Sequence, residues 1–313
     1  MKLLVTRALT PSVERRVAAE FDTTFRNGAV PLTEAEARQA LADYDALLVT
    51  LGDKMTAAAF AGQPRARIVA NFGVGYNHID VAAAKAQGIV VTNTPGAVTD
   101  ATADIGMMLI LMSARRAGAG ERFVRAGQWT GWTPTQFLGH HVSGKTVGII
   151  GFGRIGVAIA RRCHFGFGMS VLYHNRSPRA ADFPARQVSL DELLGGSDFV
   201  VMAVPASPET RHMIGAEAFA KMQPHAHFIN IARGDIVDEP ALIAALQAGR
   251  IAGAGLDVFE REPFVPEELR AMENVTLLPH LGTAALEVRD SMGFMALDNL
   301  IAFRDGLPPP NAV

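Results

Sequence analysis

Three polar residues in the second half of the chain have the types needed to reduce a carbonyl group: Arg233, Glu262 and His280. Each follows an apolar run that predicts a strand, and residues that follow parallel strands meet at the carboxyl edge of a sheet, where α/β proteins bind ligands. A guanidinium can hold a carboxylate and polarise a ketone, a histidine can donate a proton to the ketone oxygen, and a carboxylate can orient and stabilise the imidazolium. Together they predict reduction of a 2-oxo acid; a structural ion pair is the alternative.

A glycine-rich segment upstream of these residues is typical of a dinucleotide site. Gly151, Gly153 and Gly156 lie in the sequence GFGRIG, between a predicted strand and a predicted helix. We expect Gly151 to permit a tight turn, Gly153 to let a pyrophosphate approach the backbone, and Gly156 to allow close packing of the helix on the strand. The amides of Arg154 and Ile155 would then point at the anion from the helix N-terminus. The alternative is a glycine turn that binds nothing.

The residues after the next predicted strand favour NADP(H) over NAD(H). NAD-binding proteins carry an acidic residue about 20 positions after the first glycine, where it binds the ribose. This chain has Asn175, Arg176, Ser177 and Arg179 there instead. No carboxylate would repel a 2′-phosphate, and the arginines and the serine could bind one through charge-assisted hydrogen bonds. A solvated loop is the alternative, and NAD(H) use is expected at lower preference.

Other residues with potential chemistry are expected to have structural roles. His225 and His227 have no third metal ligand nearby in the sequence, so we expect no metal site. The adjacent His140 and His141 are expected on a loop surface. Cys163 lies on an apolar stretch of the helix that follows the glycine motif, which favours buried packing over reactivity.

Short β-branched runs alternate with helix-like stretches along the whole chain, which predicts α/β domains with parallel sheets. The first series of strands is expected at 3–5, 47–50, 68–70 and 89–92, with helices at 11–20 and 33–41. The second series is expected at 146–150, 170–174, 199–204, 228–231, 254–257 and 275–278. Residues 99–125 predict a single helix between the two series, and 284–303 a helix after the last strand. The terminal helix could return to the first domain, so we expect domains of 1–98 with 286–313, and of 99–285.

Length and charge narrow the possible partners. A chain of 313 residues predicts two domains, and a net charge of −2 gives no overall attraction to nucleic acid or to an acidic membrane. One cysteine cannot form an internal disulfide, the first residues lack the apolar core of a signal peptide, and no apolar run is long enough to span a bilayer. We therefore expect a cytoplasmic protein that binds neither nucleic acid nor membranes.

Four ordered motifs resemble those of the D-isomer-specific 2-hydroxyacid dehydrogenases: GFGRIG, NIARGDIVDE, GLDVFEREP and LLPHLGTA. The segment Asn71–Asp80 also matches the substrate loop of that family, so the resemblance covers nearly the whole chain. It implies a Rossmann cofactor domain inserted into a discontinuous, flavodoxin-like substrate domain. It also implies that Arg233, Glu262 and His280 are the catalytic triad, and that the enzyme is a homodimer.

The same resemblance implies contacts with substrate and cofactor. Gly73, Val74 and Gly75 would hold the substrate carboxylate through backbone amides, since glycine permits close approach. His78 and Lys54 are further candidates for substrate contact, with helix capping or surface charge as the alternative. The remaining cofactor contacts that the family implies are Thr102, Val204, Pro205, Thr210, Ile231, Ala232, Asp257 and Gly282.

Two segments are similar to the NADPH-preferring glyoxylate/hydroxypyruvate reductases within this family: 129–134, with two tryptophans and a proline, and 174–177, which reads HNRS. The similarity implies an NADP(H)-dependent reductase of small 2-oxo acids, with glyoxylate or hydroxypyruvate as substrate. Hydride would pass from the nicotinamide to the keto carbon while His280 protonates the oxygen. The alternatives are an NAD-dependent dehydrogenase of other substrate preference, such as a phosphoglycerate-type enzyme, and a nucleotide-sensing scaffold without catalysis.

Overall fold

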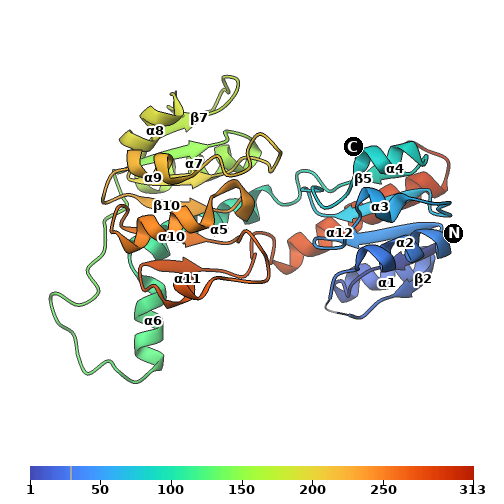
Figure 1. Ribbon diagram of the computed structural model, residues 1–313, viewed down its shortest axis with the longest axis horizontal. Helices are drawn as coiled ribbons and strands as arrows, with labels where there is room; N and C mark the ends of the chain where they lie inside the picture. Colours follow the sequence, from blue (N-terminus) through green and yellow to red (C-terminus); the bar gives the residue numbers. More distant parts are fainter. Residues whose placement is uncertain (29) are drawn as a thin grey trace. The chain divides into compact units, whose positions relative to one another are not determined.

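The computed structural model describes residues 1–28 and 30–313, which form two compact units (Figure 1). Unit 1 comprises Met1–Val98 with Thr283–Val313, and unit 2 comprises Thr99–Gly282. No helix within the two described ranges is long and apolar enough to cross a lipid bilayer.

Unit 1 is built on a parallel sheet whose strand order, β2-β1-β3-β4-β5, is that of flavodoxin-like proteins. Its strands are β1 (Lys2–Val5), β2 (Asp22–Phe25), β3 (Ala46–Thr50), β4 (Ile68–Phe72) and β5 (Val90–Thr92). The central strands β3 and β4 are buried along their whole length because helices cover both faces of a parallel sheet. The edge strand β2 was not predicted because its sequence, DTTF, has one apolar residue and only half-buried or exposed positions.

Helices of unit 1 lie on both faces of this sheet. They are α1 (Pro11–Glu20), α2 (Glu34–Asp43), α3 (Ala57–Phe60), α4 (Val81–Ala86) and α12 (Leu286–Arg304). Apolar residues of α2, α3 and α4 form one core with side chains of β1, β3, β4 and β5, while α12 contacts β4 and α1. A capping box fixes the start of α2, because Thr33 and Glu36 each accept a hydrogen bond from the other's backbone N–H.

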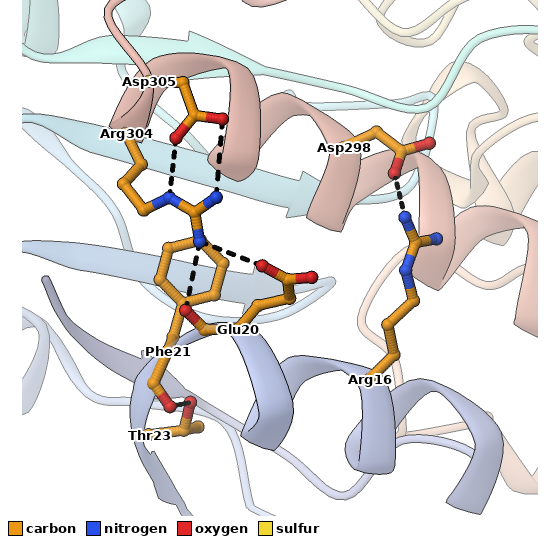
Figure 2. Close-up of polar contacts among 7 residues, drawn as sticks. All are labelled: Arg16, Glu20, Phe21, Thr23, Asp298, Arg304 and Asp305. Atoms are coloured by element: carbon orange, nitrogen blue, oxygen red, sulfur yellow. Dashed lines mark hydrogen bonds and ion pairs between the residues drawn. The ribbon is translucent and has the colours of Figure 1, made fainter.

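The last helix, α12, packs against the first one, α1, and polar contacts at the surface accompany the packing (Figure 2). Arg304 Nη1 lies 3.0 Å from Glu20 Oε2, and its guanidinium stacks over Phe21 with 5.3 Å to the ring centroid. Arg16 Nη2 lies 2.8 Å from Asp298 Oδ1. Surface pairs of this kind contribute little each, so the buried face of α12, with Met292, Ala296, Leu297 and Leu300, carries most of the attachment.

Unit 2 is built on a second parallel sheet with the order β12-β11-β10-β9-β6-β7-β8. Its strands are β6 (Thr146–Ile150), β7 (Ser170–His174), β8 (Arg186–Gln187), β9 (Phe199–Met202), β10 (His227–Asn230), β11 (Gly253–Leu256) and β12 (Val275–Leu277). The order reverses between β6 and β9, which is where sheets of the Rossmann type bind dinucleotides. The short edge strand β8 is exposed and was not predicted.

Two helical layers cover the sheet of unit 2. Its helices are α5 (Thr99–Ala114), α6 (Ala117–Arg125), α7 (Arg154–Phe167), α8 (Leu190–Gly196), α9 (Ala216–Lys221), α10 (Glu239–Gln247) and α11 (Glu267–Ala271), with a 3₁₀ turn at Gly234–Ile236. Successive strand residues point to opposite faces, so Ile149 and Val201 pack with α5 and α7, whereas Ile150 and Val200 pack with α8, α9 and α10.

The prediction of one continuous helix over 99–125 is wrong, because the chain forms α5 and α6 with a break at Arg115 and Arg116. The carbonyl oxygen of Ala114 accepts the N–H of His140 at 2.8 Å, so it is not available for a further helical turn. Arg116 has a left-handed φ of 52°. The spacing of apolar residues cannot reveal such a break, since the competing donor comes from a distant part of the sequence.

Candidate active site

A histidine and a carboxylate face each other at the carboxyl edge of the unit 2 sheet. Glu262, in the loop after β11, places Oε2 2.8 Å from Nδ1 of His280, in the loop after β12. Within the described residues Nε2 of His280 makes no hydrogen bond, and 29% of the side chain is exposed. This nitrogen is therefore available to exchange a proton with a ligand. His280 also has a φ of 55°, a conformation that non-glycine residues seldom adopt and that recurs at functional sites.

The surroundings of Glu262 favour its ionised form. Burial by itself would raise the pKa of Glu262, but the hydrogen bond and the charge of His280 outweigh this, helped by the Phe259 amide and by Arg233. The net result is a pKa below the usual range of a glutamate. An ionised Glu262 can stabilise a positive charge on the imidazole of His280.

Asp257 holds the loop that carries His280. Its Oδ1 accepts the N–H of Leu281 at 2.6 Å and its Oδ2 that of Gly282 at 2.8 Å, while its carbonyl oxygen accepts the N–H of His280 at 3.0 Å. Burial raises the pKa of Asp257, and the two amide bonds act against that increase. Thr102 Oγ1 donates to the carbonyl of Gly282 at 3.0 Å. The cofactor contacts expected of Asp257, Thr102 and Gly282 stay predictions, but each helps to shape this loop.

Arg233 follows β10, and only part of the hydrogen-bonding capacity of its guanidinium is used by the described residues. Nη1 donates to the carbonyl of Ala232 at 2.7 Å, whereas the buried Nε has no acceptor in the described parts of the chain. Burial lowers the pKa of Arg233, and the charges of Glu262 and Asp235 oppose the shift. A carboxylate ligand would supply the missing acceptor.

Asn230, at the end of β10, fixes the backbone around Arg233 and was not singled out from the sequence. Its Nδ2 donates to the carbonyl of Arg233 at 2.9 Å and its Oδ1 accepts the N–H of Ala232 at 3.0 Å. Next along the chain, a Cβ on Gly234 would lie 1.9 Å from the carbonyl carbon of Phe259. The loops after β10 and β11 therefore touch at Gly234, which brings the segment with Arg233 beside the segment with Glu262.

The glycine motif forms an open cradle after β6. Gly151 has a φ of 95°, and a Cβ on it would lie 2.7 Å from the carbonyl of Ala203. A Cβ on Gly156 would lie 2.1 Å from the carbonyl oxygen of Gly151, whereas one on Gly153 would meet nothing within 4 Å. Helix α7 begins at Arg154 with no side-chain cap, so its first amides, including that of Ile155, face this open space. The cradle fits the pyrophosphate of a dinucleotide.

Two arginines in the loop after β7 form no ion pair with a carboxylate of the described residues. Asn175 braces the loop, since its Oδ1 accepts the N–H of Phe152 at 3.3 Å and its Nδ2 donates to the carbonyl of Ser177 at 2.8 Å. Arg176 and Arg179 are exposed, and neither forms an ion pair with any described residue. The loop is therefore positively charged and accessible.

The turn after β9 and the end of β10 complete this edge of the sheet. Thr210 Oγ1 donates to the carbonyl of Pro205 at 2.9 Å and accepts the N–H of Ser207 at 2.8 Å, so its hydroxyl closes the turn. Val204 is half-buried and Pro205 is exposed, while Ile231 and Ala232 are buried. Their expected contacts with the cofactor stay predictions.

The predicted substrate loop belongs to unit 1, where Gly73, Val74 and Gly75 follow β4. A Cβ on Gly73 would lie 3.5 Å from Asn71 Nδ2, an ordinary contact. His78 is half-buried between β4 and α4, and Lys54 is exposed after β3. Their roles in substrate binding also stay predictions.

Two histidines singled out from the sequence, His225 and His227, lie at the amino edge of the unit 2 sheet, where β10 begins. His227 is 4% exposed, and its ring lies between Ser113 Oγ, 2.7 Å from Nδ1, and His140 Nδ1, 2.9 Å from Nε2. Burial, followed by the charges of His140 and His225, lowers the pKa of His227 to about 4. His225 instead binds Asp198. His140 thus has a structural contact in addition to the surface position predicted for it, and His141 is exposed.

The described residues include no cluster of metal-ligating side chains and no exposed cysteine. No group of three or more His, Cys, Asp or Glu residues in the described ranges could hold a metal ion. Cys163 is fully buried against Met107, and burial raises the pKa of its thiol to about 12. The predicted packing role of Cys163 is confirmed.

Comparison with known proteins identifies the family. The model of the D-isomer specific 2-hydroxyacid dehydrogenase NAD binding domain matches residues 107–282. The chain belongs to the D-isomer-specific 2-hydroxyacid dehydrogenase family. It is therefore an oxidoreductase that binds a nicotinamide cofactor, and the predicted family and α/β fold class are confirmed.

Relatives of this dehydrogenase match over the full chain. A glyoxylate reductase of Thermococcus onnurineus is 44% identical, covering 100% of this chain and 95% of the relative. A glyoxylate/hydroxypyruvate reductase B of Escherichia fergusonii is 42% identical over 99% of this chain and 97% of the relative. Among solved structures, an NADPH-dependent glyoxylate/hydroxypyruvate reductase of Sinorhizobium meliloti in complex with NADP and malonate has a TM-score of 0.89 and 38% identity, covering 100% of this chain and 96% of that one.

Proposed function

We propose that this dehydrogenase acts mainly as an NADP(H)-dependent reductase of small 2-oxo acids, with glyoxylate or hydroxypyruvate as substrate. The observation that carries the proposal is the pair formed by Glu262 and His280, with 2.8 Å between Oε2 and Nδ1 and with no described residue bonded to Nε2. The names of the relatives agree with these substrates.

A bound nicotinamide cofactor would supply the hydride for the keto carbon. His280 donates its Nε2 proton to the keto oxygen, because Nδ1 is engaged by Glu262. The ionised carboxylate of Glu262 stabilises the imidazolium before the proton leaves. Arg233, whose buried Nε lacks an acceptor among the described residues, binds the substrate carboxylate and polarises the ketone.

The charge of the loop after β7 supports a preference for NADP(H). Arg176, Arg179 and the Ser177 hydroxyl could bind a 2′-phosphate, and residues 175–179 include no carboxylate to repel it. The amides at the start of α7 would hold the pyrophosphate above Gly153. One solved relative is described as NADPH-dependent and contains NADP.

The two units divide these roles. Unit 2 contains the cofactor cradle and the triad, which supports a dinucleotide-binding domain over about residues 99–285. Unit 1, formed by residues near 1–98 and 286–313, would be the substrate domain, with the amides of Val74 and Gly75 binding a carboxylate.

A homodimer is the assembly that the surface of unit 2 supports. An open, largely apolar groove of about 650 Å³ on α5 and α7 is lined in part by Met108, Met112 and Phe167. The segment between α6 and β6 exposes 56% of Trp129 and 79% of Trp132. Because one chain supplies both the groove and the exposed tryptophans, a second copy is a fitting partner. Light scattering after size-exclusion chromatography measures the mass directly.

A panel of 2-oxo acids, assayed at 340 nm with NADPH and with NADH, tests the proposed reaction. We expect rapid NADPH oxidation with glyoxylate or hydroxypyruvate and a lower kcat/KM with NADH. Tight NADPH binding without turnover of any 2-oxo acid would favour a nucleotide-sensing scaffold. Faster turnover with NADH would favour an NAD-dependent dehydrogenase.

A further inference from the structure

The loop after β4 in unit 1 has three consecutive carbonyl groups that are all engaged by the protein. The carbonyl of Gly73 accepts from Asn71 Nδ2 at 2.9 Å and from the N–H of Thr94 at 3.1 Å. That of Val74 accepts from Asn93 Nδ2 at 3.0 Å, and that of Gly75 from Asn71 Nδ2 at 3.0 Å. Two asparagine side chains therefore donate hydrogen bonds to the carbonyl groups of the loop.

The planarity of the peptide bond decides where the amides of this loop point. In a trans peptide the N–H of one residue points opposite to the carbonyl of the residue before it. The carbonyls of Gly73 and Gly75 share one donor, Asn71 Nδ2, and the carbonyl of Val74 is held by Asn93, next to Thr94, whose N–H also bonds Gly73. The N–H groups of Val74, Gly75 and Tyr76 therefore point away from this group of donors. None of these three N–H groups donates to an acceptor in the described part of the chain. Successive amides turned the same way form a concavity that attracts anions.

Asn71 donates hydrogen bonds to the loop, while its own side-chain oxygen stays unpaired among the described residues. It is 1% exposed, its amide group donates to two loop carbonyls, and its buried Oδ1 has no partner among the described residues. Exchanging the oxygen and the nitrogen of this side chain would place an acceptor against two carbonyl oxygens, so the chemistry fixes its orientation. A buried acceptor left unpaired is destabilising, which indicates that holding the loop is the reason for an asparagine here.

Asn93 is held in turn by the returning end of the chain. Its backbone N–H donates to the carbonyl of Asn311 at 3.1 Å, and the N–H of Asn311 donates to Oδ1 of Asn299 at 2.9 Å. Asn299 is fully buried on α12. The side chain that holds Val74 is thus anchored to the core of unit 1.

We propose that Asn71 and Asn93 are positioning residues for substrate binding, which keep the amides of Val74, Gly75 and Tyr76 turned outward to receive a carboxylate. The two asparagines act through the loop and need no contact with the substrate. The inference rests on the proposed function, in which this loop binds the carboxylate of a 2-oxo acid.

The test compares Asn93→Ala and Asn71→Ser with the control Thr92→Val. Thr92 is fully buried beside Asn93, and its Oγ1 has no hydrogen-bond partner within the described residues, so its removal leaves the loop intact. We expect KM for glyoxylate to rise about tenfold in Asn93→Ala, which loses one hydrogen bond to the loop, and at least as much in Asn71→Ser, which loses two. The kcat value and KM for NADPH should change little, and Thr92→Val should behave like the wild type.

A substrate without a carboxylate separates positioning from general damage. Binding of oxamate, a non-reducible carboxylate, should weaken by the same factor as KM rises, whereas kcat/KM for methyl glyoxylate should be unchanged. Equal losses with acid and ester, or an unaltered KM for glyoxylate in Asn93→Ala, would overturn the positioning role. If Asn71→Ser fails to fold in a thermal melt, Asn93→Ala decides the question.

The result also distinguishes this inference from the proposed function. A wild-type enzyme that reduces no 2-oxo acid would contradict the proposed function alone. Calorimetric titration with oxamate then still tests the positioning role of the asparagines. Weaker oxamate binding in Asn93→Ala would support that role, and unchanged binding would contradict it.

Discussion

Two of the histidine–carboxylate pairs in unit 2 lie at opposite edges of the same sheet, and their distances are nearly equal. His280 and Glu262 are 2.8 Å apart at the carboxyl edge, and His225 Nε2 and Asp198 Oδ1 are 2.9 Å apart at the amino edge. Asp198 also accepts the N–H of Thr146 at 2.8 Å, so the second pair ties strand starts together. Glu262 has Arg233 as its further neighbour instead. His212 Nε2 and Glu260 Oε1, in the loops after β9 and β11, are also 2.8 Å apart. Neither the distance nor the edge of the sheet alone therefore identifies a catalytic pair, and Arg233 beside Glu262 distinguishes the pair with His280.

The largest expected effect comes from removing the histidine of each pair in turn. His280→Ala should lower kcat about 1000-fold, since a positioned general acid contributes roughly 10²–10⁴. His225→Ala should leave kcat within about twofold, because surface pairs contribute little. Steady-state assays give kcat, and fluorescence titration should show NADPH binding retained in both variants. Similar activity in the two variants would contradict a catalytic role for His280 that His225 lacks.

An effect of intermediate size is expected on cofactor binding when Arg176 and Arg179, at the carboxyl edge, are replaced. The double substitution Arg176→Ala with Arg179→Ala should raise KM for NADPH about 10–100-fold, as charge-assisted hydrogen bonds are lost, and leave KM for NADH nearly unchanged. Arg186→Ala is the matched control, because that arginine is paired with Glu192. If both cofactors lose affinity equally, the loop does not recognise a 2′-phosphate.

The smallest effect on turnover is expected from His227, whose contribution is to stability. Its pKa is lowered from 6.5 to about 4 in the folded protein, so the unfolded chain binds the extra proton first and stability falls as the pH drops through this window. The loss amounts to about 3 kcal/mol between these values. His227→Gln should keep kcat at neutral pH but lack this part of the acid sensitivity. Urea unfolding at pH 7 and pH 5 should reveal about 2 kcal/mol of this loss in the wild type and none of it in the variant. An identical pH dependence in both proteins would contradict the role.

The sequence predicts those parts of the site that depend on residue type and strand order. Arg233, Glu262 and His280 each follow an apolar strand, and the glycine motif lies between a strand and a helix, so their positions at one edge follow from parallel topology. The edge strands β2 and β8 were not predicted. β2 has a single apolar residue and no buried position, and β8 has only two residues, both exposed.

The asparagines were missed for a different reason. Asn71, Asn93 and Asn230 act by bonding backbone carbonyls, and the conformation of those loops is not visible in residue types. A signal was present, since each lies within or directly after a buried strand, where an unpaired amide is unfavourable. A polar residue at such a position indicates a partner in the adjoining loop.

The most direct test of the central claim follows the fate of the transferred hydrogen. Glyoxylate is incubated with the wild-type enzyme and NADPH that carries two deuterium atoms at C4 of the nicotinamide, and the glycolate formed is examined by proton NMR. We predict one deuterium on C2 of each glycolate molecule, formed at a rate that His280→Ala reduces about 1000-fold. Glycolate without deuterium, or an equal rate in the variant, would contradict hydride transfer assisted by His280.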